Sequence, residues 1–155
     1  MKKFWLAYAT GLGSGLAPVA SGTFGTLVGI PIVIGLSAFF PPWVMLAVTA
    51  VMFFVGVYAT KIAMAHYEKK DPGQVVIDEI CGFMIAMYIV PLTWQHLLLA
   101  FLAFRVFDII KPWPAYGFDK MDTPWGVMLD DIAAGVYANI VVQLVMFAGF
   151  LPARA

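Results

Sequence analysis

Five long blocks of the sequence contain almost no charge, and this pattern constrains the fold more than any other feature. The blocks are Leu27–Phe40, Trp43–Met64, Ile80–Val90, Leu97–Ile110 and Ile132–Leu151. A helix that spans a bilayer needs about 20 apolar residues, and Trp43–Met64 and Ile132–Leu151 reach that length. Leu27–Phe40 is short unless its helix begins near Thr23. Ile80–Val90 is shorter still, so it must tilt, lie in a thinned bilayer or be sheltered by neighbouring helices.

The composition points to the same class of protein. Hydrophobic residues make up 63% of the chain and charged residues only 12%, whereas soluble domains contain about 25% charged residues. The 155 residues suffice for one domain. We therefore predict an all-α, polytopic membrane bundle with about four to five membrane segments, formed by a single integral-membrane domain over residues 1–155.

The basic residues indicate how this bundle is oriented. If all five blocks cross the membrane, residues 1–25, 66–79 and 111–131 lie on one side. That side then receives Lys2, Lys3, Lys61, Lys69, Lys70, Lys111 and Lys120. Only Arg154 falls on the opposite side. Because loops rich in lysine and arginine stay in the cytoplasm, the first side is expected to be cytoplasmic.

Most of the remaining charge falls in three short motifs, each at the predicted cytoplasmic end of an apolar block. The motifs are "VVIDEICG" (75–82), "FRVFDIIKPWP" (104–114) and "GVMLDDIAAG" (126–135). The adjacent acids of the first and third motifs are expected to open helices, where the helix dipole favours anions. In the second motif, Arg105, Asp108 and Lys111 are spaced by three and share one helix face.

Each motif alone is more often a helix cap or an ordinary ion pair than a functional site. Three such motifs at one membrane face indicate a site, because charge near a bilayer is costly and is retained mainly for function. We expect the carboxylates to supply Mg²⁺ ligands and one general base, since Mg²⁺ prefers oxygen ligands. These carboxylates are Asp78, Glu79, Asp108, Asp130 and Asp131. Arg105 and Lys111 would hold phosphate oxygens.

This set predicts metal-assisted attack of water on a phosphate monoester at the membrane surface. A covalent aspartyl-phosphate remains an alternative route, because aspartate also serves as a nucleophile. His66 and His96 fall near opposite membrane faces in this topology, so together they cannot form a zinc site.

The stretch "TGLGSGLAPVASGTFGT" (10–26) is the remaining unusual feature. It lacks the lysine of a Walker loop and the third glycine of a dinucleotide-binding motif, so a nucleotide-binding role is excluded. Two interpretations stay open. The stretch is either an uncharged wall of the phosphate site, with Gly22 and Thr23 nearest the lipid headgroup, or a place of close backbone packing.

Taken together, these motifs resemble the bacterial phosphatidylglycerophosphatase A family. The matching pieces are "GLGSGLAPVASGTFGT", "VVIDEICG", "FRVFDIIKPWPAYGFD" and "GVMLDDIAAGV", in the family's order and spanning about residues 11–136. One departure is Ser21, which stands where the family usually has proline in a Pro-Gly-Thr sequence. The glycine and threonine, Gly22 and Thr23, are kept.

The resemblance implies a multi-pass enzyme of the bacterial inner membrane with its active site facing the cytoplasm. Such an enzyme removes the terminal phosphate of phosphatidylglycerophosphate with Mg²⁺ and yields phosphatidylglycerol and inorganic phosphate during phospholipid biosynthesis. Two alternatives remain: a Mg²⁺-dependent phosphatase or phosphotransferase acting on another lipid phosphate, and a small membrane transporter. A transporter would distribute charge through the membrane depth instead of gathering it at one face.

Overall fold

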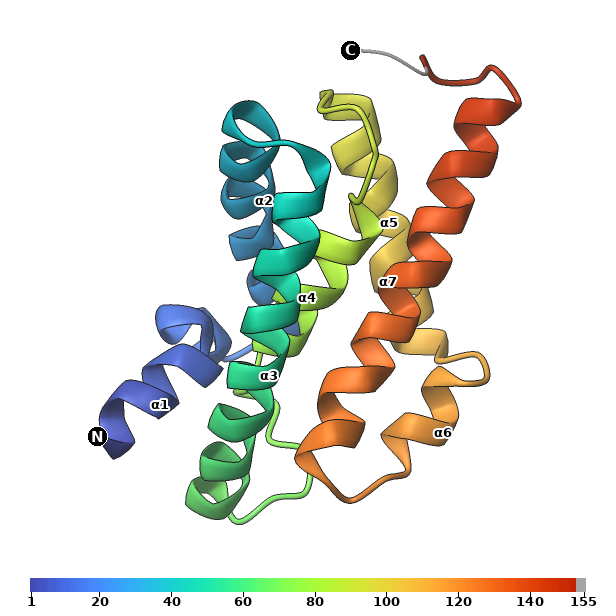
Figure 1. Cartoon of the computed structure of the whole chain (residues 1–155). Coiled ribbons are helices and arrows are strands. Elements are labelled where there is room, and N and C mark those ends of the chain that lie inside the picture. Colours follow the sequence, from blue (N-terminus) through green and yellow to red (C-terminus); the bar gives the residue numbers. More distant parts are fainter. Residues whose placement is uncertain (153–155) are drawn as a thin grey trace.

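The computed structural model describes residues 1–152, and every regular element in that part of the chain is a helix (Figure 1). The elements are α1 (Lys2–Ala9), the 3₁₀ helix η1 (Gly11–Leu16), α2 (Ser21–Phe39), α3 (Pro42–Tyr67), α4 (Ile77–Ala86), α5 (Trp94–Ile110), α6 (Ala115–Asp119) and α7 (Pro124–Phe147). The prediction of an all-α bundle is therefore confirmed.

Three helices are long and apolar enough to cross a membrane: α2 with 19 residues, α3 with 26 and α7 with 24. The first span reaches this length because α2 begins at Ser21, ahead of the apolar block that starts at Leu27. Helices α2, α3, α4, α5 and α7 alternate in direction (Figure 1), but α4 has only 10 residues and α5 has 17. The structure thus supports three candidate spans, fewer than the four to five membrane segments predicted.

Helix α4 lies at the centre of the bundle and packs against α2, α3, α5 and α7. Eight of its ten residues are buried. At 1.5 Å per residue it is about 15 Å long, half the thickness of the hydrocarbon core of a bilayer. Among the options left open for this short apolar block, the structure therefore shows shelter by neighbouring helices.

The packing of α4 on α7 depends on two glycines that let the helix backbones touch. A Cβ atom added at Gly135 of α7 would overlap the carbonyl oxygen of Gly82. A Cβ atom added at Gly82 would lie 2.5 Å from the carbonyl oxygen of Asp131 and 2.6 Å from the Phe104 ring. Small residues allow close helix approach in the same way in membrane bundles generally.

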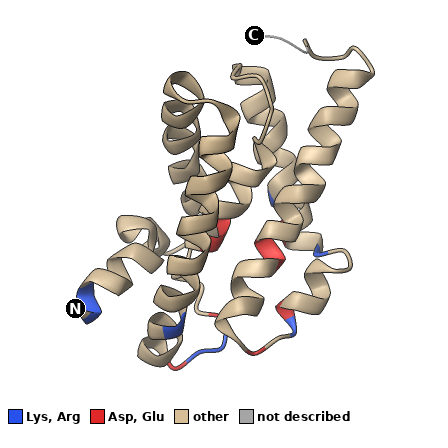
Figure 2. Cartoon of the chain, viewed as in Figure 1, with Lys and Arg blue, Asp and Glu red and all other residues tan. Residues whose placement is uncertain are grey.

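The charged residues of the described chain gather in one half of the bundle, the lower half in Figure 2. Asp78 and Glu79 lie in the first turn of α4, as predicted. The matching prediction for Asp130 and Asp131 was wrong. Helix α7 begins earlier, at Pro124, and the Thr123 hydroxyl caps it by accepting from the Gly126 backbone N–H at 3.2 Å. The two aspartates lie beyond the first turn, where they face the interior.

We predict that Gly135→Ala destabilises the folded protein. The added methyl group must push the α7 backbone away from α4, and backbone atoms cannot turn aside as a flexible side chain can. The matched control is Gly35→Ala in α2, because a Cβ atom at Gly35 would meet nothing within 4 Å. Thermal unfolding of the purified proteins in detergent should show a lower midpoint for Gly135→Ala alone. Equal midpoints for the two variants would contradict the close contact.

Candidate active site

A small pocket of about 80 Å³ lies where α4, α5 and α7 meet the start of α2 and the loop before α4. Its lining residues are Ser21, Asp71, Gly73, Val75, Asp78, Glu79, Asp108, Lys111, Val127, Asp130 and Asp131. The structure therefore brings together all five carboxylates singled out in the sequence, and it places Lys111 beside them. Four separate segments of the chain contribute to this one pocket.

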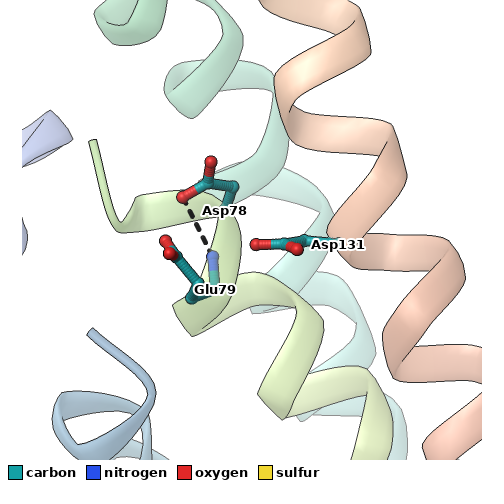
Figure 3. Close-up of side chains that lie close together, drawn as sticks. All are labelled: Asp78, Glu79 and Asp131. Carbon is teal, nitrogen blue, oxygen red and sulfur yellow. Dashed lines mark hydrogen bonds between the residues drawn. The ribbon is translucent and has the colours of Figure 1, made fainter. Parts of the chain in front are cut away.

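Three of the acids form a tight cluster, shown in Figure 3. Asp78, Glu79 and Asp131 each offer a carboxylate oxygen, and these oxygens lie within 4.8 Å of one another. Asp131 points from α7 toward the first turn of α4, where the Asp78 Oδ1 accepts a hydrogen bond from the Glu79 backbone N–H at 3.0 Å. Asp78 and Asp131 are only 6% and 4% exposed. This all-oxygen set could bind a metal ion, and its chemistry suits a hard divalent cation.

Arg105 and Asp108 of α5 lie next to this cluster. Arg105 Nη1 forms an ion pair with Asp108 Oδ2 at 2.6 Å, so these two residues share one face of α5, as the sequence spacing predicted. The Glu79 Oε2 is buried and has no hydrogen-bond partner among residues 1–152. Buried polar atoms without a partner are rare. An acceptor left open in an acid-lined pocket is suited to a cation, and the Arg105 guanidinium group, which like Glu79 lies next to Gly22, offers donors of the kind that suit a phosphate.

Lys111 is held more firmly than the sequence suggested. It caps the C-terminal end of α5, and its Nζ pairs with Asp130 Oδ2 at 2.6 Å and also with the Asp119 carboxylate. Burial lowers the pKa of Lys111, but the hydrogen bonds and charges of Asp119 and Asp130 outweigh that effect and hold its pKa above the ordinary value. Lys111 is therefore cationic at neutral pH.

Asp71 is a pocket residue that the sequence analysis missed. It belongs to the turn-like "YEKKDPG", and the structure places it among the residues that line the pocket. The pKa of Asp71 is raised above its ordinary value. Desolvation of the carboxylate and the charges of Asp119 and Asp108 raise it, and the charge of Lys111 offsets them only in part. Its position in the sequence could have indicated this role, because a loop that leads into the helix start at Asp78 and Glu79 must lie near those acids.

The glycines of this stretch have different surroundings, and close backbone packing holds for some of them. Gly15 and Gly25 pack against the loop before α4, where added Cβ atoms would overlap Gln74 and lie 2.5 Å from Val76. Gly22 faces the site instead. A Cβ atom there would overlap Glu79 Oε1 and lie 2.8 Å from Arg105 Nη1. Of the hydroxyl residues at the start of α2, Ser21 lines the pocket and Thr23 does not.

The pocket is lined by carboxylates that could hold a metal ion, and three helices of the described chain are apolar enough to cross a membrane. These features fit the class of membrane enzymes that use a metal ion. Residues 7–146 match the family model described as Phosphatidylglycerophosphatase A. The chain belongs to the phosphatidylglycerophosphatase A family, and it is thereby a phosphoric monoester hydrolase.

Individual relatives agree with this assignment. A phosphatidylglycerophosphatase A of Haemophilus influenzae is 39% identical over 90% of this chain and 86% of its own length. The protein of the same name from Escherichia coli is 35% identical over 88% of this chain and 80% of its own. A Bacteroides thetaiotaomicron protein with the provisional name phosphatidylinositol-3-phosphatase is 35% identical over 87% of this chain and 89% of its own length. No solved structure matches the chain.

We predict that Gly22→Ala lowers phosphatase activity about 10-fold or more while the protein stays folded. The methyl group would meet the ends of two flexible side chains, so Glu79 and Arg105 would move, and small displacements of catalytic groups are costly in rate. Gly35→Ala again serves as the control in the same helix. Phosphate release and thermal unfolding measured on both variants would check this. Unchanged activity in Gly22→Ala would show that the contact is irrelevant to the site.

Proposed function

We propose that the acidic pocket is the active site at which the terminal phosphate of phosphatidylglycerophosphate is hydrolysed with Mg²⁺. The products are phosphatidylglycerol and inorganic phosphate. The observation that supports this most is the convergence of Asp78, Glu79 and Asp131 on one point, with the guanidinium group of Arg105 close to Glu79. Membership of the phosphatidylglycerophosphatase A family supports the choice of lipid.

Asp78, Glu79 and Asp131 would hold the metal ion, because their carboxylate oxygens converge and none of the ion pairs within residues 1–152 involves them. A bound Mg²⁺ would lower the pKa of a coordinated water and offset negative charge on the phosphate. Asp108 and Asp130 each pair with a cation. They therefore serve as further ligands or as the general base that accepts the proton of the attacking water.

Arg105 and Lys111 bind the phosphate. Arg105 extends from α5 toward Gly22 in the first turn of α2, and its guanidinium group has five N–H donors, so it can meet a phosphate oxygen while it pairs with Asp108. Lys111 lines the pocket, where it lies beside Asp130 and Asp119. The apolar side chains Phe24 and Val106 near Gly22 and Arg105 are about half exposed, at 48% each. This surface allows the acyl chains to stay in the bilayer while the headgroup enters the pocket.

A second candidate function is hydrolysis of another lipid phosphate. The name of the Bacteroides relative suggests this alternative. The pocket residues recognise a phosphate monoester and a cation, and both lipid classes carry the monoester. A transporter is disfavoured because the charged residues of the described chain lie in one half of the bundle, as Figure 2 shows.

We predict that the purified protein releases phosphate from phosphatidylglycerophosphate with Mg²⁺ and not after chelation by EDTA. Phosphatidic acid and phosphatidylinositol 3-phosphate should be poorer substrates. Asp131→Asn and Asp108→Asn should each lower the rate about 100-fold or more, because they remove charge from the reacting centre. Asp122→Asn is the control, since Asp122 is an exposed aspartate that pairs with Lys70. Folding of each variant is checked by thermal unfolding.

The outcomes separate the alternatives. No release from any of the three lipids by the folded protein would overturn the proposed activity. A preference for phosphatidylinositol 3-phosphate would favour the second candidate. Activity that persists in EDTA, or wild-type rates in Asp131→Asn, would exclude the metal role proposed for the cluster.

We also propose that the protein lies in the bacterial inner membrane with the charged half of the bundle in the cytoplasm. The lysines of that half support this orientation. A membrane-impermeant thiol reagent applied to intact spheroplasts should label Ser37→Cys, and should label Lys69→Cys only after the membrane is opened. Both positions are exposed, and the native Cys81 is buried and serves as the unlabelled background. The reverse pattern would contradict the orientation.

A further inference from the structure

We infer that Asp119 is a positioning residue of the hydrolytic site and holds the Lys111 ammonium beside Asp130. The inference rests on the proposed function, because it assigns a role within the same pocket. Asp119 is the last residue of α6, eight positions after Lys111, and it does not line the pocket itself. Within residues 1–152, its direct side-chain contact with a pocket residue is the ion pair with Lys111.

The side chains of Asp119, Lys111 and Asp130 are linked by two ion pairs that lead from the surface to the pocket. Exposure falls from 38% for the Asp119 side chain to 23% for Lys111 and 7% for Asp130. Asp130 in turn accepts the backbone N–H of Asp131 through its Oδ1 at 2.9 Å. Asp119 therefore connects, through two intermediate residues, to an acid of the proposed metal cluster.

The donor count of Lys111 shows what this arrangement achieves. An ammonium group has three N–H donors. Two of them are directed at the carboxylates of Asp119 and Asp130, and Lys111 lines the pocket. With two donors fixed, the third has a defined direction and is available for a phosphate oxygen. Without Asp119, only Asp130 would hold the ammonium group, which could then rotate, so the third N–H donor would no longer have a fixed direction.

Asp119 is not needed to attach α6 to the bundle, because other contacts do so. The Tyr137 hydroxyl on α7 donates to the Trp113 carbonyl oxygen at 2.6 Å. Gly126 of α7 lies so close to α6 that an added Cβ atom would be 2.6 Å from the Phe118 carbonyl oxygen. A substitution of Asp119 can therefore change the site while the fold is kept.

The chain offers a matched control in the same loop. Asp122 pairs with Lys70, but the side chains of this pair are 58% and 75% exposed and do not contact the pocket. Exposed ion pairs contribute little to stability. Asp119→Asn and Asp122→Asn make the same chemical change three residues apart, and only the first touches Lys111.

The test is a double-mutant cycle on phosphate release from phosphatidylglycerophosphate with Mg²⁺. Asp119→Asn should lower kcat/KM about 10-fold or more in the wild-type background and less than about twofold in a Lys111→Met background, because its effect passes through Lys111. Asp119→Glu, which keeps the charge, should recover part of the loss. Asp122→Asn should leave kcat/KM unchanged.

Three outcomes would overturn the inference. One is the same fold-change for Asp119→Asn in both backgrounds, which would show that Asp119 acts apart from Lys111. Another is an equal loss in Asp122→Asn, and the third is an Asp119→Asn protein that does not fold. An inactive wild-type protein would instead overturn the proposed function, so the two failures are distinguishable.

Discussion

The contact between the α4 and α7 backbones is the interaction on which the site depends. Gly82 and Gly135 let the two helices touch, and the carbonyl oxygen of Asp131 lies at that same crossing. The close approach brings Asp131 of α7 next to Asp78 and Glu79 of α4. A larger residue at either glycine would widen the crossing and separate the acids. The packing of small residues and the chemistry of the pocket are therefore one structural feature.

Collecting acids inside an apolar bundle is energetically unfavourable, and the structure shows how the cost is limited. Removing a carboxylate from water without a partner costs several kcal/mol or more. Two of the five acids of the sequence motifs are offset directly, Asp108 by Arg105 and Asp130 by Lys111. No ion pair within residues 1–152 involves Asp78, Glu79 or Asp131, and a divalent cation bound between them would supply the missing charge. Stability and metal binding are then expected to be coupled.

Much of the fold and of the site could be read from the sequence, for identifiable reasons. Apolar length indicates membrane helices wherever it occurs, and the scarcity of charge made the three acidic motifs conspicuous. The number of spans could not be read in the same way, because shelter of α4 by its neighbours is a property of the bundle and not of the segment. The helix start predicted at Asp130 was wrong because Thr123 and Pro124 provide an earlier cap. Asp71 was missed because its turn-like surroundings resemble an ordinary solvated loop.

The sequence by itself determined the class of protein, the family and the residue types available for chemistry. These follow from local properties, namely apolar block length, charge placement and motif order. The tertiary structure alone decided which residues act together. It separated the cluster of Asp78, Glu79 and Asp131 from the acids paired with cations, directed Gly22 at Glu79 and Arg105, and joined Asp119 to the pocket through Lys111. The physical reason is that these contacts join different helices, and their geometry is set by how closely the helices pack.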